Sequence, residues 1–287
     1  MHLIDRFTST SKINLYLDIV GKDPIDGYHY IESIYYEIPW GDDFEIYSSQ
    51  QDYVEFIDIS LEEIPQENTV TKALKLFKEK FKITESYYIK IKKNVPMGAG
   101  LGGGSGDAGS LLKWLARRFA IEITNCISIA QKIGSDVPFF LYGKMALVEG
   151  KGEIVTPLEN TLKGMHLVII YPNIHVSTKK AFEIIAQNNC ITNSKSQQLK
   201  NLKKNKLELD NLKKLIYNIF NNSLQILNQD LYEFRKNLDD FLSPDIIMMT
   251  GSGSSFILFY QEKENLDHIK NKIAHNINHS KIFIHSI

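Results

Sequence analysis

The chain has 287 residues, enough for one large domain or two smaller ones, and its 43% hydrophobic and 23% charged content is typical of a folded globular protein rather than a disordered or fibrous one. Its 33 Lys and Arg residues nearly cancel its 34 Asp and Glu residues, so the formal net charge is −1. Without an overall basic field, a dedicated nucleic-acid binder is not expected.

Residue periodicity predicts strands and one helix before residue 93. Residues 12–20 alternate and predict a half-buried strand. Its apolar face carries Ile13, Leu15, Leu17 and Ile19, and its polar face carries Lys12, Asn14 and Asp18. Turn residues at 22–29 lead to a second strand at 31–38. Helical spacing at 68–81 and renewed alternation at 88–92 predict a helix followed by a strand.

A glycine-rich loop at residues 96–106 precedes apolar residues spaced three and four apart, which predicts a helix that begins near Asp107. A second helix is expected at 127–133, ending at Gly134, with a strand around 146–148. Gly150, Gly152 and Pro157 mark a domain boundary near residue 160. We therefore expect two domains, residues 1–160 and residues 161–287.

The second half predicts a strand at 167–171, a helix at 178–186, and two buried strands, 245–250 and 256–260, joined by a Gly-Ser loop. Residues 192–215 are rich in Lys and Asn. A solvated linker with a helix face explains this segment better than an anion-binding arm does, so no function is assigned to it.

The two cysteines, Cys126 and Cys190, form neither a CxxC pair nor a zinc-ligand pattern, which favours a reducing compartment. Charged residues interrupt the first ten positions, and no stretch of about 18 apolar residues occurs. We expect a cytoplasmic protein with no membrane partner.

Five glycines lie within seven positions of the loop: Gly98, Gly100, Gly102, Gly103 and Gly104. This density costs backbone entropy, and a turn that only permits tight packing would need one or two glycines. Without Cβ atoms the amides can approach a polyphosphate closely, and the following helix adds unpaired N–H groups and a positive dipole end. The loop therefore predicts triphosphate binding.

Other motifs explain the loop less well. Residues 98–103 fit GxGxxG, but the polar residues around them do not form a Rossmann βαβ unit. No Walker A sequence and no protein-kinase signature is present, and an SxxK at residues 9–12 lacks its partner motifs. His275 and His279 could share a helix face as metal ligands, but no third ligand is near them in the sequence.

Residues 96–105 resemble the nucleotide loop of the GHMP kinases, which are small-molecule kinases. Together with residues 11–17, 26–29, 133–140 and 250–254, in this order and spacing, they are similar to the 4-diphosphocytidyl-2-C-methyl-D-erythritol kinase family. The resemblance spans residues 11 to about 256. It implies an α+β, two-domain GHMP kinase fold, with an N-terminal half like ribosomal protein S5 domain 2, a ferredoxin-like C-terminal half, and a cleft that holds ATP and the cytidine substrate.

The resemblance implies transfer of the ATP γ-phosphoryl group, with Mg²⁺, to the 2-hydroxyl of 4-(cytidine 5'-diphospho)-2-C-methyl-D-erythritol in the non-mevalonate (MEP) route to isoprenoids. Asp136 matches the catalytic base and Lys12 its partner. Tyr28, His29 and Phe182 match positions at the cytosine, and Asn14 and Thr178 are further substrate contacts. The implied ATP-binding residues are Pro96, Met97, Gly98, Ala99, Gly100, Leu101, Gly102, Gly103, Gly104, Ser105, Gly106, Asn68 and Lys93.

The loop departs from the family pattern at two positions. Family loops read Gly-Gly-Gly-Ser-Ser, then Asp or Asn and two alanines, whereas Gly106 and Gly109 replace the second Ser and the second Ala. At Gly106 only the backbone N–H is left for a phosphate contact, and Ser105 could contact phosphate or Mg²⁺. Asp107 either supports Mg²⁺ or favours the helix N-terminus. No protein metal ligand and no oligomeric state is assigned.

Three alternatives stay open. Phe182 could be an ordinary helix core residue instead of a cytosine contact. The chain could be another GHMP small-molecule kinase. It could also be a catalytically silent nucleotide-binding module, because the end of its loop is altered.

Overall fold

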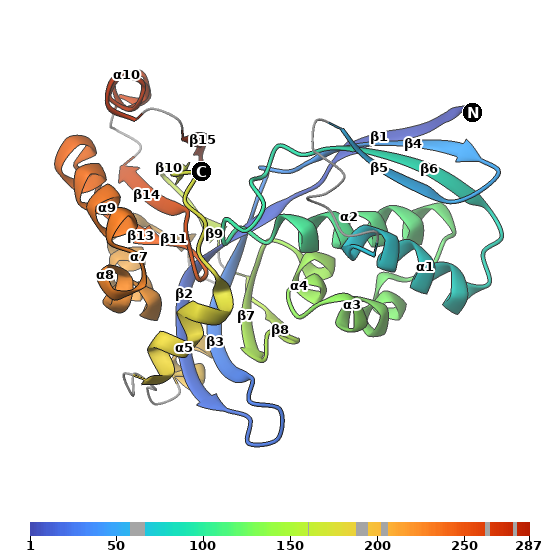
Figure 1. Cartoon of the computed structure of the whole chain (residues 1–287), viewed down its shortest axis with the longest axis horizontal. Helices are drawn as coiled ribbons and strands as arrows, with labels where there is room; N and C mark the ends of the chain where they lie inside the picture. Colours follow the sequence, from blue (N-terminus) through green and yellow to red (C-terminus); the bar gives the residue numbers. More distant parts are fainter. Residues whose placement is uncertain (58–66, 160, 188–194, 202–205, 262–264, 278–279) are drawn as a thin grey trace.

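The computed structural model describes residues 1–57, 67–159, 161–187, 195–201, 206–261, 265–277 and 280–287 (Figure 1). A five-stranded sheet runs through the middle in the order β12-β2-β3-β7-β8. Its strands are β2 (Ser11–Lys22), β3 (His29–Ile38), β7 (Met145–Gly150), β8 (Ile154–Pro157) and β12 (Tyr217–Asn218). The short β12 comes from the second half of the chain and pairs in parallel with β2.

A second sheet of the N-terminal half has the order β1-β4-β6-β5. Its strands are β1 (Leu3–Thr8), β4 (Asp43–Ser49), β5 (Tyr53–Ile57) and β6 (Ser86–Lys92). One face packs on α1 (Thr69–Phe81), α2 (Gly103–Arg118) and α3 (Ile127–Ile133), with the 3₁₀ helix η2 (Ile123–Cys126) and α4 (Val137–Tyr142) beside them (Figure 1). The centre of this layer is apolar and includes Phe44, Phe77, Ile89 and Leu111. Burial of each such side chain contributes about 1.5–3 kcal/mol to the free energy of folding.

The C-terminal half holds an antiparallel sheet in the order β13-β14-β10-β15. Its strands are β10 (Met165–Tyr171), β13 (Ile246–Met249), β14 (Phe256–Gln261) and β15 (Lys281–Ser286). Helices connect β10 to β13, and α10 (Leu266–Asn276) connects β14 to β15. This is a βαββαβ arrangement with the strand order of a ferredoxin-like domain, which confirms the predicted α+β fold class.

The remaining elements lie between β8 and β13 in the sequence. They are β9 (Thr161–Leu162), α5 (Thr178–Gln187), α6 (Ser196–Lys200), β11 (Lys206–Leu207), α7 (Leu209–Leu215), η3 (Ile219–Ser223), α8 (Leu224–Leu227) and α9 (Gln229–Leu242). Strands β9 and β11 pair in parallel. No helix in the described ranges is long and apolar enough to cross a membrane.

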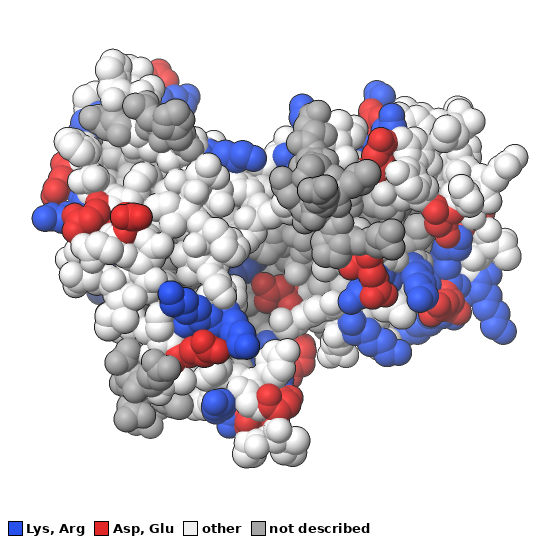
Figure 2. Space-filling view, viewed as in Figure 1, with Lys and Arg blue, Asp and Glu red and all other residues white. Residues whose placement is uncertain are grey.

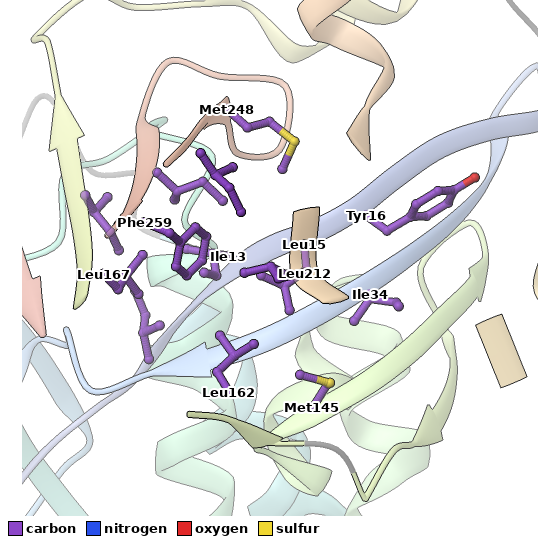
Figure 3. Packing of buried hydrophobic residues seen from close by; sticks show 14 of the residues in the cluster. Ile13, Leu15, Tyr16, Ile34, Met145, Leu162, Leu167, Leu212, Met248 and Phe259 are labelled. Carbon is purple, nitrogen blue, oxygen red and sulfur yellow. The ribbon is translucent and has the colours of Figure 1, made fainter. Parts of the chain in front are cut away.

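One hydrophobic cluster joins the two halves (Figure 3). Ile13 and Ile34 of the central sheet pack in it with Leu167 of β10 and Phe259 of β14. Residue 160 lies outside the described residues, so the division into residues 1–160 and 161–287 stays a prediction. The shared core means that the central sheet and the ferredoxin-like sheet bury their apolar faces together.

The predicted helices at 68–81, 127–133 and 178–186 and the predicted strands appear with small shifts in their ends. Two expectations were wrong. Strand β2 is buried on both faces from Ser11 to Ile19, because its polar face lines an interior site. Helix α2 begins at Gly103 rather than near Asp107. In the described parts of 192–215, α6 and α7 bury Leu199, Leu209 and Leu212 and expose most of their other described residues, which agrees with the helix face expected there.

Candidate active site

Two pockets border the glycine loop. The larger, about 740 Å³, is lined by Lys12, Asp136 and Tyr28 among others. The smaller, about 470 Å³, lies between residues 93–105 of the loop region and Asn68. Gly100 and Gly102 line both pockets. The surface is hollowed between the two halves of the molecule, with acidic and basic side chains in and around the hollow (Figure 2).

Lys12 and Asp136 meet at the inner end of the larger pocket. The Lys12 Nζ lies 3.9 Å from Asp136 Oδ2, donates to the Gly100 carbonyl at 3.2 Å and lies 4.7 Å from the centre of the Tyr35 ring. Burial lowers the pKa of Lys12, and the negative charge of Asp136 opposes this shift. The predicted pair is therefore brought together, beside the loop that the two pockets share.

Tyr35 completes this group, and sequence reasoning missed it. Its hydroxyl donates to Asp136 Oδ1 at 2.9 Å. Burial, followed by the charge and hydrogen bond of Asp136, raises the pKa of Tyr35 well above its usual range, so the phenol stays protonated. The other carboxylate oxygen, Oδ2, faces Lys12. The β2–β3 register pairs Asn14 with Tyr35, and this pairing, which the sequence does not show, places Tyr35 in the site.

Asn14 holds Lys12 in place. Its Oδ1 accepts from Lys12 Nζ at 2.8 Å, and its Nδ2 donates to Ser33 Oγ at 2.8 Å. The Asn14 backbone N–H donates to Thr250 Oγ1 at 2.9 Å. Both ends of this amide are thus engaged by the protein, and the predicted substrate contact at Asn14 stays a prediction.

The glycine loop is tied to the surrounding strands. The Lys12 N–H donates to the Leu101 carbonyl at 2.9 Å, and the Ser255 N–H donates to the Ala99 carbonyl at 3.2 Å. Gly100 has φ +78°, and a Cβ there would lie 2.3 Å from the Thr250 carbonyl oxygen. Only glycine fits this close approach, so the loop lies against the chain that carries Thr250.

The first turn of α2 supplies the unpaired N–H groups of the smaller pocket, at residues 102–105. The Gly106 N–H already donates to the Gly102 carbonyl at 2.8 Å, so the expectation that it is left for phosphate was wrong. A Cβ at Gly106 would lie 1.9 Å from the Thr10 carbonyl oxygen. The departure from the family pattern at Gly106 therefore follows from tight packing.

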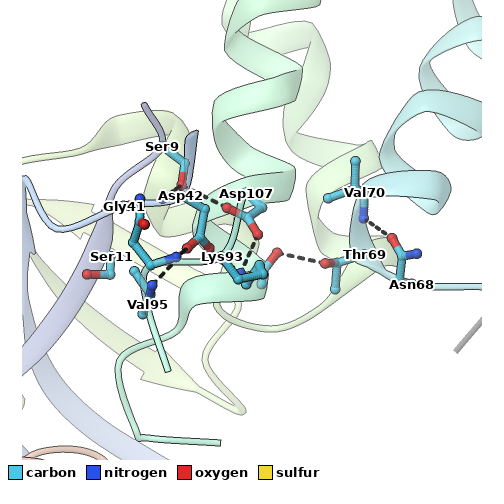
Figure 4. A network of polar contacts seen from close by, with 12 residues as sticks. Ser9, Ser11, Gly41, Asp42, Asn68, Thr69, Val70, Lys93, Val95 and Asp107 are labelled. Carbon is cyan, nitrogen blue, oxygen red and sulfur yellow. Dashed lines mark hydrogen bonds and ion pairs between the residues drawn. The ribbon is translucent and has the colours of Figure 1, made fainter. Parts of the chain in front are cut away.

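A buried ionic network around Asp107 of α2 lies next to the loop (Figure 4). Lys93 pairs with Asp107 at 2.7 Å and with Asp42, and Ser9 Oγ donates to Asp107 at 2.7 Å. Burial raises the pKa of Asp107 to about 7, against the opposing charge of Lys93. Lys93 lines the smaller pocket, but its ammonium is shared between the two carboxylates.

Among the described residues, Asp107 was the candidate carboxylate for the Mg²⁺ that the family implies. Both oxygens of Asp107 already accept hydrogen bonds, from Ser9 and Lys93. Among the described residues, no three His, Cys, Asp or Glu side chains gather around one point that could hold a metal. His279 lies outside the described residues. The described residues therefore form no preformed centre of three such ligands.

Asn68 is the N-cap of α1. Its side-chain oxygen accepts from the N–H groups of Val70 and Thr71, each at 3.0 Å, and Thr71 Oγ1 accepts the Asn68 N–H at 2.9 Å. This reciprocal capping box explains why the helix begins there. Asn68 also lines the smaller pocket, and its predicted place near adenine stays a prediction.

The predicted cytosine residues line the outer part of the larger pocket. The rings of His29 and Phe182 stack with centroids 5.1 Å apart, and Tyr28 is 65% exposed. The buried His29 Nε2 has no hydrogen-bond partner in the described structure, and burial, helped by Lys22, lowers the pKa of His29. Thr178 Oγ1 lies 2.9 Å from Ser252 Oγ. A planar ligand would find the exposed Tyr28 ring here, whereas the unpartnered His29 Nε2 is covered by protein atoms.

Comparison with known proteins decides the family. The family model of the GHMP kinases N terminal domain matches residues 68–144. The 4-diphosphocytidyl-2-C-methyl-D-erythritol kinase of Thermotoga maritima is 34% identical over 254 residues, which cover 88% of this chain and 90% of that protein. The chain belongs to this kinase family. The protein of the same name from Francisella tularensis subsp. tularensis is 33% identical over 276 residues, which cover 93% of this chain and 92% of the relative.

Solved structures support the fold of this kinase family. A crystal structure of 4-(cytidine 5'-diphospho)-2C-methyl-D-erythritol kinase has a TM-score of 0.78 at 24% identity and covers 98% of both chains. A homoserine kinase from Cytophaga hutchinsonii has a TM-score of 0.70 at 17% identity, covering 98% of this chain and 94% of the other. These likenesses confirm the predicted GHMP kinase fold.

Proposed function

We propose that the chain transfers the γ-phosphoryl group of ATP to the 2-hydroxyl of 4-(cytidine 5'-diphospho)-2-C-methyl-D-erythritol, in the MEP route to isoprenoid precursors. The observation that carries this proposal is the Lys12–Asp136 pair, 3.9 Å apart, at the glycine loop that two pockets share. ATP would occupy the smaller pocket and the cytidine substrate the larger one. The predicted cytoplasmic location, without nucleic-acid or membrane partners, is part of this proposal.

The smaller pocket would bind the phosphates through backbone amides. The first turn of α2 offers N–H groups and the positive end of the helix dipole, which favour anionic oxygens. Ser105 adds a hydroxyl at the same turn. Magnesium usually reaches such sites through nucleotide phosphates and water, so we expect it to arrive with ATP rather than on protein carboxylates.

Asp136 would accept the proton of the acceptor hydroxyl. Its Oδ1 is held by the Tyr35 phenol, which leaves Oδ2 as the proton acceptor. In the loose transition state of phosphoryl transfer, positioning and charge stabilisation supply most of the rate enhancement. The Lys12 ammonium lies beside Oδ2, where it would stabilise the oxygen that loses its proton.

The larger pocket would orient the acceptor substrate through its cytosine ring. Tyr28 and Phe182 offer aromatic faces, and the unpartnered His29 Nε2, which is covered in the structure, would bond a pyrimidine after a small shift of its ring. The reacting hydroxyl would then lie at the inner end of the pocket. Because the outer pocket would hold the cytosine and the inner end the reacting hydroxyl, a cytidine diphosphate substrate fits the pocket better than a smaller alcohol.

ATP consumption by the purified protein tests the proposal. We expect turnover with the cytidine diphosphate methylerythritol and little with mevalonate or homoserine. Faster turnover with either of those alcohols would assign the chain to another GHMP kinase activity. ATP binding without product in a single-turnover experiment would make it a silent nucleotide-binding module.

The Asp136→Asn variant tests the base. General base catalysis typically contributes about 10²–10⁴-fold, so kcat should fall by that order while ATP affinity changes by less than about threefold. Asp267→Asn, on the exposed side of α10, is the matched control and should leave both constants unchanged. Near-normal kcat in Asp136→Asn would remove this residue as the base.

A further inference from the structure

The loop between β2 and β3 carries Tyr28 into the larger pocket, and His29 follows it at the start of β3. It is folded by short-range bonds: the Asp23 N–H donates to the Tyr28 carbonyl at 2.7 Å, and Asp26 Oδ1 accepts the Tyr28 N–H at 3.0 Å. Ile25 at its tip is 95% exposed. Hydrophobic packing therefore does little to hold the tip against the rest of the protein.

Lys151 connects this loop to the turn between β7 and β8. Its Nζ pairs with Asp23 Oδ2 at 2.9 Å and with Asp26 Oδ2, and lies 5.6 Å from the centre of the Tyr28 ring. The Lys151 N–H donates to Glu153 Oε2 at 2.7 Å, which anchors the lysine backbone. One ammonium thus binds two carboxylates of the loop and lies beside its aromatic ring.

The two carboxylates are themselves tied to the loop backbone. Asp23 Oδ1 accepts the Ile25 N–H at 2.8 Å, while its Oδ2 also accepts the Tyr30 hydroxyl at 2.9 Å. Because each carboxylate binds both Lys151 and the loop, moving the lysine would move the loop that bears Tyr28. Lys151, Asp26 and Tyr28 all line the larger pocket, so this arrangement is part of the pocket wall.

We propose that Lys151, Asp23 and Asp26 form a clamp that sets substrate affinity by holding Tyr28 in position at the mouth of the larger pocket. Lys151 is then a positioning residue. The ligand whose affinity it sets is a pyrimidine nucleoside, and in this the inference rests on the proposed function. Lys151 could instead bind the substrate diphosphate directly. Its ammonium is already paired with Asp23 and Asp26, which favours the positioning role.

Uncharged cytidine separates the two roles. The clamp acts through Tyr28, so Lys151→Met should weaken cytidine binding and raise KM for the cytidine diphosphate substrate by a similar factor, about 5–10-fold. Both kcat and KM for ATP should stay within about twofold. If cytidine binds Lys151→Met as it binds the wild type, and only the diphosphate substrate is affected, Lys151 contacts the diphosphate and the clamp is wrong.

Replacing the two carboxylates removes negative charge, whereas Lys151→Met removes positive charge. Asp23→Asn with Asp26→Asn breaks the clamp but frees the ammonium, so we expect weaker cytidine binding, as in Lys151→Met. Tighter binding of the diphosphate substrate together with unchanged cytidine binding would overturn the clamp. Lys151→Arg, which keeps the charge, should recover most of the cytidine affinity.

Salt dependence adds a readout that loss of folding would not mimic. Cytidine carries no charge, so any weakening of its binding between about 0.05 and 0.5 M NaCl comes from screening of the protein's own charges. The wild type should show this weakening and Lys151→Met should not, and equal salt dependence in both would overturn the clamp. Lys270→Met, which breaks the ion pair with Asp267 on α10, is the control and should behave as wild type.

Cytidine binding by the wild type separates a wrong clamp from a wrong substrate. Wild-type protein that binds no cytidine at all would count against the proposed substrate. Wild-type protein that binds cytidine, with variants that bind it equally well, would count against the clamp alone.

Discussion

The ammonium of Lys12 is buried, and polar neighbours offset part of the free energy that burying its charge costs. It lies between the Asn14 amide oxygen and the Gly100 carbonyl, and the face of Tyr35 covers it. Burial still lowers its pKa, and Asp136 opposes that shift. An ammonium held in this way is ready to meet the negative charge that develops on a reacting oxygen.

The lowered pKa of Lys12 predicts an alkaline limit to activity. As pH rises, Lys12 should lose its proton at a pH below 10.5, the pKa of an ordinary lysine. The kcat should fall as that proton is lost. Lys12→Arg, whose side chain stays protonated, should be slower but should lack this limb. A kcat profile from pH 7 to 11 measures both, and the same limb in Lys12→Arg would assign it to another group.

Gly106 and Gly109 are packing positions as well as loop residues. A Cβ at Gly109 would lie 2.4 Å from the Phe140 Cβ, and one at Gly106 would lie 1.9 Å from the Thr10 carbonyl oxygen. We expect Gly106→Ala to lose about 1–3 kcal/mol of unfolding free energy through overpacking. Gly104→Ala is the matched control, because its Cβ would lie 3.4 Å from Thr69 Oγ1. Urea unfolding compares them, and equal stabilities would contradict this packing.

Residue-scale roles were predictable only where the family pattern covers them. The pattern identified Lys12 and Asp136, which the structure brings together. It gave no reason for Gly106, because the reason is the Thr10 carbonyl on a distant segment. Tyr35 and Lys151 escaped notice for a similar cause, since their contacts with Asp136, Asp23 and Asp26 come from pairing between strands and turns.

At the scale of the element, α1 shows how a cap serves both stability and position. The Asn68 box fixes where the helix begins, and Thr69 Oγ1 in its first turn donates to the Gly104 carbonyl at 2.7 Å. The start of α1 is therefore bonded to the start of α2. Loss of the cap would loosen one wall of the smaller pocket.

Asn68→Ala should lower the free energy of unfolding by about 1 kcal/mol, as is usual for removal of an N-cap. Asn68→Ser keeps a capping oxygen and should retain most of the stability. Thermal or urea unfolding of the two variants makes the comparison. If Asn68→Ala is as stable as the wild type, the capping box contributes nothing to the fold.

Elements with a long periodic pattern were predictable, and short ones were not. Helices α1, α3 and α5 and strand β10 carry repeated apolar positions and appear within a few residues of their predicted bounds. Strands β9, β11 and β12 have two residues each, so they exist only because a distant strand pairs with them. The polar face of β2 was expected to be solvated because a sequence does not show that a site lies behind it.

At the scale of the whole molecule, the two halves are joined by packing as well as by chain. Trp40 stacks on Phe283 of β15, with ring centroids 5.3 Å apart and planes within 5°. β12 adds a strand from the second half to the central sheet. We therefore expect the halves to unfold together.

Two single-tryptophan variants test this coupling. The chain has two tryptophans, so Trp114→Phe leaves only Trp40, next to Phe283, and Trp40→Phe leaves only Trp114, inside the N-terminal half. In each variant, urea curves from tryptophan fluorescence and far-UV circular dichroism should coincide. A separate transition reported by fluorescence would show that the N-terminal half unfolds alone.

The wall formed by Gly100 and Gly102 has a stereochemical consequence for the proposed reaction. Because the donor and acceptor pockets meet at this wall, the phosphoryl group would pass directly from one oxygen to the other while both molecules are bound. A direct transfer between opposite sides of the phosphorus inverts its configuration once. A γ-phosphate made chiral with oxygen isotopes should therefore emerge inverted, with no phosphorylated enzyme along the way.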